Sequence, residues 1–311
     1  LGRAFYNRIV SESGSTYIDW ENPENNTFHL ALEVTCQNGG DEFRPDIVIF
    51  INGLPLSYIE VKQPNAIRDG KTAIQSEQSR TAVRFENRRF RRFNNITQLI
   101  SFSDNLPYIS GQGQQKQGSF YCSNAFSKTK FNAFKEEREE ELIYSIRSLG
   151  EEEIDAVLKD VNRFALKSQP EFKTNQDPST PCNTFISSLY QKERLLFLLR
   201  YGLAYVEEHS KDGTIQLQKH VMRYPQFFAT KAIEVAIGKG VKKGVIWHTQ
   251  GSGKTALSYF NIRYLTNYFS KQEIVPQFYF VVDRLDLADQ ATREFTKRGL
   301  KVKRINRPQE L

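Results

Sequence analysis

Apolar and polar residues follow a strand-like pattern along the first third of the chain. The two kinds of residue alternate over 28–36, two apolar runs fill 44–64, and a further apolar run covers 97–104. Alternation with a period of two, and short apolar runs bounded by turn residues, are typical of β-strands. With helical segments between them, these strands predict a mixed α/β domain.

The last third of the chain follows a different order, in which predicted strands and helices alternate. A helix predicted at 224–237 is followed by a strand, a glycine turn, a second helix and a repeat of that order. The predicted strands are 244–247, 278–283 and 301–305. Such alternation is typical of a parallel sheet, so we predict a second α/β domain here.

A charged helical pattern over 125–166 and a polar, proline-bearing connector over 167–183 separate these two parts. Proline together with Ser, Thr, Asn and Asp is typical of linkers. We therefore predict one domain at 1–170, and connector helices with a second domain at 171–311.

The composition is that of a soluble globular protein. Of 311 residues, 39% are hydrophobic and 25% are charged, and no apolar run approaches the roughly 20 residues of a membrane-spanning helix. The three cysteines are far apart and form no C-x-x-C pair, which argues against a disulfide framework or zinc site and favours the cytoplasm. The first residues, LGRAFYNRIV, lack a methionine and the order of a signal peptide, so we expect a piece of a longer polypeptide.

Positive charge is concentrated toward the end of the chain. The net charge is +7, and residues 223–311 carry 16 Lys and Arg against 7 Asp and Glu. This distribution predicts a polyanionic partner such as nucleic acid.

A glycine-rich loop, HTQGSGKT at 248–255, follows one predicted strand and precedes a helix. In this setting backbone N–H groups converge on phosphate oxygens, Lys254 would reach the β and γ phosphates of ATP, and Thr255 would bind Mg²⁺. The converging groups belong to Gly251, Ser252, Gly253, Lys254 and Thr255. His248 stands where the usual pattern has its first glycine, and the alternative is a fortuitous glycine turn.

Two flanking stretches resemble motifs of superfamily 2 helicases. RYPQ at 223–226 resembles the Q-motif, in which a glutamine, here Gln226, reads adenine through its paired donor and acceptor. The alternative for Gln226 is a solvated residue at a helix start. VVDRLDLADQ at 281–290 resembles motif Ia, which touches the DNA backbone in that superfamily. An acidic box and a second lobe do not follow by Leu311, so we do not expect this chain to hydrolyse ATP alone.

Charged residues interrupt the apolar stretch 44–64 in the order Asp46, Glu60, Lys62. Hydrolysis of a phosphodiester needs a metal to offset charge and to activate water, and two carboxylates suit Mg²⁺. Lys62 adds a positive charge beside the nucleophile. Glu60 and Lys62 share one face of a strand, with Val61 turned the other way into the core. This is the order of the PD-(D/E)xK nucleases; the alternative is a surface salt bridge on a hairpin.

The turn of this hairpin decides whether Asp46 shares a face with Glu60. A two-residue turn would set Asp46 opposite Ile59, on the far face, because a one-residue slip exchanges faces. We therefore predict a three-residue turn with Gly53 left-handed, which pairs Asp46 with Tyr58 and leaves Glu60 diagonal to it. On this reasoning, a two-residue turn excludes the site.

A nuclease pattern followed by a motor pattern resembles the R (HsdR) subunit of type I restriction endonucleases. The stretches FRPDIVIFINGLPLSYIEVKQP, GSFYCSNAFSKTKFNAFKEE and GVIWHTQGSGKT carry the resemblance, which spans most of the chain. It implies a restriction-endonuclease-like domain and a RecA-like motor lobe that is incomplete at its C-terminus. It also implies Mg²⁺ and ATP as cofactors, double-stranded DNA and the methyltransferase (M) and specificity (S) subunits as partners, and a bacterial or archaeal cytoplasm.

The same family carries a Q-x-x-x-Y motif on the helix after the hairpin. Here it points to Gln75 as a catalytic, substrate-orienting residue, with Ser79 where the motif has tyrosine. In a basic stretch just after this helix, Arg80, Arg84 and Arg88 recur every four residues and would share one face, which suits DNA phosphates. The alternative is a solvated helix face.

These patterns together predict the motor and nuclease subunit of a type I restriction-modification system, with Mg²⁺-dependent DNA cleavage coupled to ATP-dependent translocation. One alternative is a free-standing helicase-nuclease of DNA repair or phage defence. Another is a DNA-binding module with an inactive nuclease fold. Copurification of methyltransferase subunits separates the first alternative, and metal-dependent cleavage separates the second.

Overall fold

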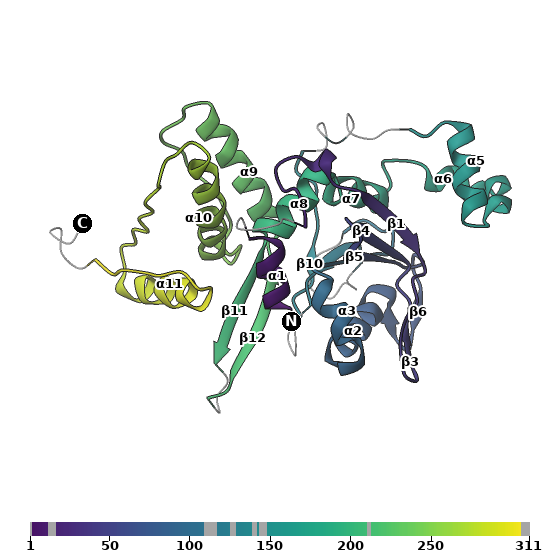
Figure 1. The fold of residues 1–311 in the computed structure, drawn as a ribbon, viewed down its shortest axis with the longest axis horizontal. Helices are drawn as coiled ribbons and strands as arrows, with labels where there is room; N and C mark the ends of the chain where they lie inside the picture. The colour runs from purple at the N-terminus through teal and green to yellow at the C-terminus, as the bar shows by residue number, and fades with distance from the viewer. Residues whose placement is uncertain are drawn as a thin grey trace. The chain divides into compact units, whose positions relative to one another are not determined.

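A six-stranded mixed sheet forms the centre of the first of two structural units (Figure 1). The computed structural model describes residues 2–11, 17–108, 117–124, 129–138, 142, 148–209 and 213–305. One unit comprises Gly2–Phe197 and the other begins at Leu198. The domain division predicted at 170/171 stays a prediction.

The sheet has the strand order β1-β4-β5-β8-β9-β10, and all neighbouring strands are antiparallel except β5 and β8. The strands are β1 (Phe28–Leu32), β4 (Ile47–Ile51), β5 (Leu54–Val61), β8 (Leu99–Ser103), β9 (Ser119–Cys122) and β10 (Asn132–Ala133). The strands predicted within 28–36, 44–64 and 97–104 are therefore confirmed.

Helix α2 (Ala73–Glu86) covers one face of this sheet. Because β5 and β8 are parallel neighbours, the chain between them must cross over, and α2 lies in that connection. Ile74 and Phe85 of α2 are buried in the core that the sheet and helix share. The other buried members are Phe43, Val48, Tyr58, Phe90, Ile100, Phe102, Phe120 and Cys122. Apolar burial on this face fixes the helix against the strands.

Helix α7 (Pro181–Leu189) and the residue that follows it pack on the first unit through a different set of contacts. Phe185 of α7 meets Phe134 edge to face, with ring centroids 5.3 Å apart. The Tyr190 hydroxyl lies 2.9 Å from Ser57 Oγ and donates to Ser101 Oγ at 2.8 Å, so polar atoms of β5 and β8 find partners. Burial raises the pKa of Tyr190 to about 12.

Short elements complete the first unit. They are α1 (Arg3–Ile9), η1 (Pro23–Asn25), the paired strands β2 (Cys36–Asn38) and β3 (Asp41–Phe43), the paired strands β6 (Ile67–Arg68) and β7 (Lys71–Thr72), η2 (Arg88–Phe90), α3 (Arg91–Ile96), α5 (Glu151–Asp160), η3 (Phe164–Ser168), α6 (Pro170–Asn175) and α8 (Lys192–Tyr201), whose last residues belong to the second unit. Of the helical pattern predicted over 125–166, α5 and η3 are confirmed and 132–133 is a strand, while 125–128, 139–141 and 143–147 lie outside the described residues.

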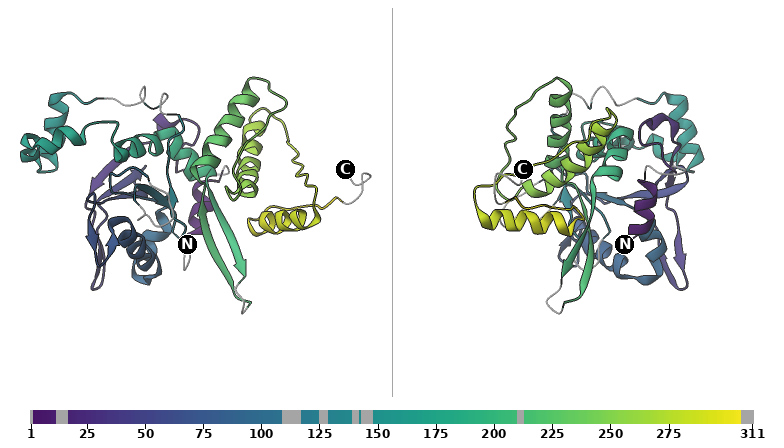
Figure 2. Two further views of the ribbon diagram at one scale, coloured as in Figure 1. Left: turned by 180° about the vertical axis from the view of Figure 1, so that it is seen from behind. Right: turned by 60° about the vertical axis from the view of Figure 1, so that its left-hand side comes forward.

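After the end of α8, the described residues of the second unit form an antiparallel hairpin and three helices. The hairpin pairs β11 (Leu203–His209) with β12 (Ile215–Val221), and the helices are α9 (Tyr224–Gly238), α10 (Lys254–Ser270) and α11 (Leu285–Lys297). Figures 1 and 2 show α9 and α10 side by side, and the hydroxyl of Thr230 contacts Asn261 Oδ1 between them at 2.8 Å. The helices predicted at 224–237, after the glycine turn and after 283 are confirmed. In the described part of the chain, every helix is too short or too polar to span a bilayer.

The parallel sheet predicted for this unit is not formed among the described residues. The stretches 244–247, 278–283 and 301–305 have no strand assignment, and Val245, Trp247 and Val281 are 90%, 91% and 89% exposed. Parallel strands depend on hydrogen bonds from neighbours that are distant in the chain. Local sequence gives these stretches their apolar character, but no described strand pairs with them.

Candidate active site

The hairpin of β4 and β5 has a two-residue turn, so the predicted three-residue turn is wrong. Ile51 lies opposite Leu54, and Asn52 and Gly53 have φ of 50° and 81°. Asn-Gly is the preferred pair for a turn that needs positive φ at both positions. The expectation that such a turn puts Asp46 and Glu60 on opposite faces is also wrong, because the ladder shifts further along.

A β-bulge in β5 restores the face that the turn alone would lose. Phe50 lies opposite Pro55, but Ile49 lies opposite Ser57, so Leu56 is the extra residue. The shifted register places Ile47 opposite Ile59, and its continuation brings Asp46 beside Glu60. Proline has no N–H to give to a ladder and is tolerated at bulges, so Pro55 is the sequence signal for this shift.

Asp46 precedes β4 and is tied to the end of β5. Its Oδ2 accepts a hydrogen bond from the Val61 N–H at 2.7 Å, and its carbonyl accepts one from the Glu33 N–H at 2.9 Å. The Val61 side chain is 46% exposed, so the prediction that it lies in the core is wrong. Asp46 is thus oriented by backbone on both sides, with its carboxylate partly open to solvent.

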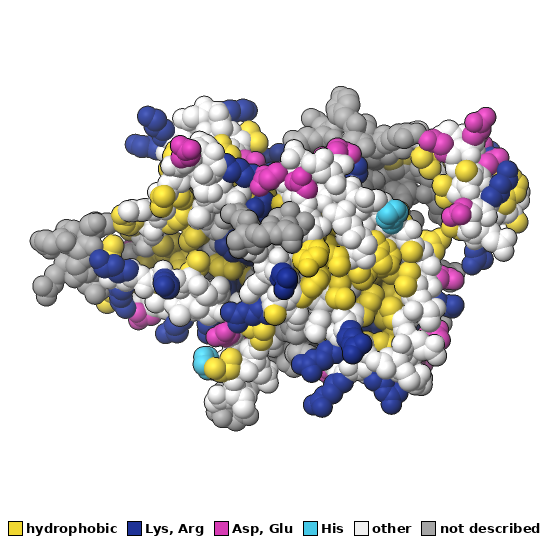
Figure 3. All heavy atoms as spheres, viewed as in Figure 1, with side chains coloured by type: hydrophobic (Ala, Val, Ile, Leu, Met, Phe, Trp, Pro, Cys, Tyr) yellow, Lys and Arg dark blue, Asp and Glu magenta, His cyan; other side chains and the backbone are white. Residues whose placement is uncertain are grey.

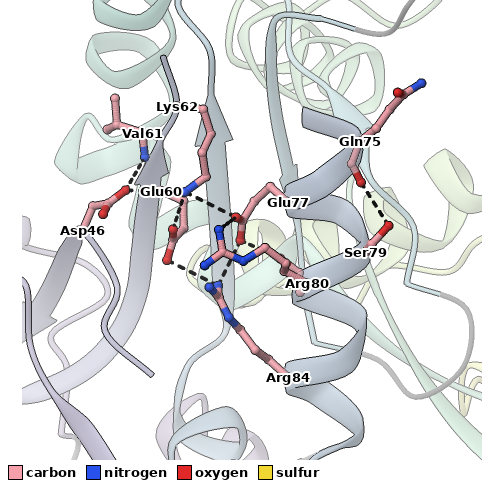
Figure 4. Close-up of polar contacts among 10 residues, drawn as sticks. Asp46, Glu60, Val61, Lys62, Gln75, Glu77, Ser79, Arg80 and Arg84 are labelled. Atoms are coloured by element: carbon pink, nitrogen blue, oxygen red, sulfur yellow. Dashed lines mark hydrogen bonds and ion pairs between the residues drawn. The ribbon is translucent and has the colours of Figure 1, made fainter. Parts of the chain in front are cut away.

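The Lys62 ammonium lies among three carboxylates (Figure 4). Its Nζ is 2.7 Å from Glu60 Oε2, 3.3 Å from Glu77 Oε2 and 3.8 Å from Asp46 Oδ2. The backbone N–H of Lys62 donates to the Ser103 carbonyl at 2.8 Å, which continues the pairing of β5 with β8. The structure therefore brings Asp46, Glu60 and Lys62 together and adds a third acid.

Glu77 of α2 is the residue that the sequence analysis missed. Its side chain is fully buried, and its Oε1 lies 2.9 Å from Arg84 Nη1 and accepts a hydrogen bond from Thr81 Oγ1 at 3.2 Å. A signal for it exists in the sequence. Ile74, Glu77, Thr81 and Phe85 recur every three or four residues, so a glutamate stands on the buried face of the helix.

Arg84 joins the two glutamates from the helix side. Its Nη1 lies 2.9 Å from Glu77 Oε1 and 3.4 Å from Glu60 Oε1, and its guanidinium carbon lies 4.1 Å from the centroid of the Phe43 ring. Each oxygen of Glu60 therefore faces a different cation, Arg84 at Oε1 and Lys62 at Oε2.

Burial and neighbouring charges shift the titration of two groups in this cluster. Burial raises the pKa of Glu60, and the Glu77 carboxylate adds to the rise, while Lys62 and Arg84 oppose it. Burial alone would lower the pKa of Lys62, but the carboxylates of Glu77 and Glu60 outweigh it and raise the pKa overall. The cluster therefore favours a charged lysine at neutral pH.

The glycine-rich loop is tied to α9 by Gln226. Gly251 and Gly253 have φ of 76° and 85°, and Lys254 and Thr255 begin α10. Gln226 is buried; its Nε2 donates to the Gly253 carbonyl at 3.0 Å, and its Oε1 accepts from the Arg223 N–H at 2.9 Å. Ser252 is buried beside it, and Lys254 Nζ donates to the Thr249 carbonyl at 3.0 Å.

Comparison with known families matches both parts of the chain. Residues 2–140 match the family model of the type I restriction enzyme R protein N terminus. This part of the chain belongs to the type I restriction R protein family. Residues 225–311 match the SWI2/SNF2 ATPase family model, which agrees with a helicase-like ATPase region around the glycine-rich loop.

Relatives of the R protein family match across both regions. A provisionally named type I restriction enzyme endonuclease subunit, MjaVIIP of Methanocaldococcus jannaschii, is 30% identical over 89% of this chain and 22% of its own length. The provisionally named MjaIXP subunit of the same organism is 24% identical over 95% of this chain and 26% of its own length. The HindI endonuclease subunit of Haemophilus influenzae is 27% identical over 90% of this chain and 22% of its own length. The chain thus spans about a quarter or less of the length of these relatives.

Gln75, which the motif of the R protein family singled out, is not brought to the cluster. It is the third residue of α2, where its Oε1 accepts from the Thr72 N–H at 3.0 Å and its N–H donates to Thr72 Oγ1 at 3.2 Å. This reciprocal pair is a capping box. Figure 4 shows its side chain directed away from Glu60 and Lys62.

The three predicted arginines do not form one stripe. Arg80 is half exposed and lies 3.6 Å from Glu77 Oε2, whereas Arg84 is largely buried in the carboxylate cluster. Arg88 lies in η2, because α2 ends at Glu86. The prediction that the three arginines share one helix face is therefore wrong, because the helix ends before Arg88.

Proposed function

We propose that this chain is the nuclease and motor part of a type I restriction subunit, which cuts duplex DNA with Mg²⁺ and translocates along it with ATP. The observation that supports this most strongly is the approach of Asp46, Glu60 and Lys62 at the start of β4 and the end of β5, within the segment that matches the R protein family. Relatives named as type I restriction enzyme endonuclease subunits support the same function.

The donor atoms of the cluster fit a divalent cation. Carboxylate oxygens are the ligands that Mg²⁺ prefers, and the carboxylates of Asp46 and Glu60 lie 3.8 Å and 2.7 Å from the same Lys62 Nζ. Among the described residues, no three acidic, His or Cys side chains are already arranged as a metal site, and Lys62 Nζ contacts both Glu60 and Glu77. We assign Asp46 and Glu60 as the ligands.

Each residue of the cluster has a separate task in this proposal. When bound, Mg²⁺ would offset the charge of the scissile phosphate and lower the pKa of the attacking water. Asp46 keeps its orientation through the Val61 N–H, and Glu60 keeps its own on a buried strand. Lys62 remains protonated and stabilises negative charge on the phosphate.

The glycine-rich loop is proposed to bind ATP. Backbone N–H groups of Gly251, Ser252 and Gly253 at the start of α10 suit phosphate oxygens, with Lys254 for the β and γ phosphates and Thr255 for Mg²⁺. Gln226, predicted to read adenine, now holds the loop through Gly253, so reading the base requires that its amide change partners. We do not expect the 311-residue chain to hydrolyse ATP alone.

DNA and the methyltransferase and specificity subunits are the proposed partners, in a bacterial or archaeal cytoplasm. Figure 3 shows Lys and Arg side chains gathered over α2 and α3. Arg80 and Arg88 are exposed in this region, so we assign them to DNA phosphates, and Arg84 to the carboxylate cluster instead.

The test of this proposal is Asp46→Ala in the full subunit, purified with its partner subunits. We expect plasmid cleavage in Mg²⁺ and ATP to fall by more than 100-fold, while ATP hydrolysis stays within about twofold, since the loop lies in the other unit. Glu42→Ala on β3 is the control, because Glu42 is exposed and nearby in sequence. Cleavage that survives Asp46→Ala would refute the nuclease assignment, and a subunit that never copurifies with methyltransferase would refute the restriction assignment.

A further inference from the structure

Glu77 occupies an unusual position for a buried carboxylate. Its side chain has no solvent exposure, and Oε2 accepts no hydrogen bond although two cations lie near it, Lys62 at 3.3 Å and Arg80 at 3.6 Å. A carboxylate without full hydrogen bonding is costly to bury. Its presence on the face of α2 that meets the sheet therefore calls for a role beyond packing.

The cations that contact Glu77 are the same cations that contact Glu60. Arg84 Nη1 is closer to Glu77 (2.9 Å) than to Glu60 (3.4 Å), so Glu77 draws the guanidinium toward the helix. Lys62 is shared in the same way between Glu60 at 2.7 Å and Glu77 at 3.3 Å. Without the Glu77 charge, both cations would be left with Glu60 as their main buried partner.

This competition matters for a divalent cation. An ion that binds Asp46 and Glu60 must compete for the Glu60 oxygens with Lys62 and Arg84. We propose that Glu77 is a positioning residue of the site, which draws Arg84 and Lys62 away from Glu60 and so keeps that carboxylate available to the metal. This inference rests on the nuclease function proposed above.

The proposal predicts opposite effects for two single substitutions. Glu77→Gln keeps the shape but removes the competing charge, so Arg84 and Lys62 turn to Glu60 and metal binding weakens, by roughly 10-fold to 100-fold as for other outer-shell partners. Arg84→Gln removes one competitor from Glu60, so metal binding tightens, by about tenfold, equivalent to about 1.4 kcal/mol. Glu86→Gln is the matched control, because Glu86 is exposed on the same helix.

The double variant separates an action through Arg84 from any other action. If Glu77 works by holding Arg84, Glu77→Gln has no further effect once Arg84 is removed, so the double variant binds metal about as tightly as Arg84→Gln alone. Affinity of the double variant as weak as that of Glu77→Gln alone would overturn the proposal, because Glu77 would then act without Arg84.

The measurement is calorimetric titration of Mn²⁺ into the full chain without nucleotide, after removal of bound metal, with thermal unfolding in EDTA to establish that each variant is folded. If Glu77→Gln does not fold, Arg84→Gln alone decides: tighter Mn²⁺ binding supports the proposal, and unchanged binding overturns it.

Asp46→Ala separates a failure of the proposed nuclease site from a failure of the inference about Glu77. If it leaves Mn²⁺ binding intact, the proposed nuclease site fails; if it abolishes binding while the Glu77 and Arg84 variants match the native protein, only this inference fails.

Discussion

Lys62 shows how neighbouring charges decide the state of a single residue. Its ammonium is largely buried, which on its own would lower its pKa, yet the Glu77 and Glu60 carboxylates raise it. A lysine whose pKa is raised in the folded state stabilises the fold fully at any pH below its ordinary, unfolded-state pKa. That contribution is lost only as the pH rises through the raised pKa. Lys62 therefore serves as a fixed positive charge at neutral pH, rather than as a proton acceptor.

Gly253 offers a residue-scale test of the contact between Gln226 and the loop. An alanine Cβ at Gly253 would lie 2.6 Å from Gln226 Nε2, whereas one at Gly251 would meet nothing within 4 Å, although both glycines have positive φ. Each alanine carries about 1–2 kcal/mol of left-handed strain, but only Gly253→Ala also displaces a buried amide.

We expect Gly253→Ala to lower the free energy of unfolding by at least about 1 kcal/mol more than Gly251→Ala, because hydrogen bonds of the buried Gln226 are lost. Urea unfolding of the two variants measures the difference. Equal losses would mean that Gln226 does not brace the loop.

At the level of secondary-structure elements, the sequence predicts an extra residue in the β4–β5 hairpin but not its position. The period of β-strands correctly requires one extra residue between Asp46 and Glu60. Asn52-Gly53 formed the two-residue turn that its chemistry favours, so the extra residue went into β5 at Leu56, next to Pro55. The proximity of Asp46, Glu60 and Lys62 was thus predictable from their order in the sequence and from the two-residue period of strands. The position of the register shift was not, because it depends on how the two strands pair.

Helix α2 shows what single-residue motifs leave out. Gln75 was chosen by spacing, but spacing does not distinguish a capping residue from a catalytic one. Glu77, two positions away, is directed at the sheet only because of where the helix begins. The side of a helix that faces a site depends on its first residue, which Thr72 sets as the N-cap.

Gln75 provides a test at this scale. Gln75→Ala breaks the capping box, so we expect a loss of about 0.5–1 kcal/mol in the free energy of unfolding and no change in the cleavage rate. Gln75→Glu can make the same reciprocal contact and should retain the stability. A cleavage defect in Gln75→Ala at unchanged stability would restore the catalytic assignment.

At the scale of the whole molecule, the two units were predictable to different degrees. The first unit makes its own hydrogen-bonded sheet, so local pattern and structure agree for β1, β4, β5 and β8. In the second, α9, α10 and α11 form where their patterns predict, but the apolar stretches between them pair with no described strand. Sequence pattern gives the type of an element, while strand pairing depends on partners far along the chain.

We propose that the carboxylates of Asp46 and Glu60 form one metal site beside Lys62. Crystals of the intact protein grown with Mn²⁺, measured at the manganese absorption edge, test it most directly. We expect an anomalous difference peak within about 2.0–2.6 Å of oxygens from both Asp46 and Glu60, the distance range of oxygen-bound divalent cations. A peak elsewhere in this unit, or none at a saturating Mn²⁺ concentration with both carboxylates still held by Lys62 and Arg84, would contradict it.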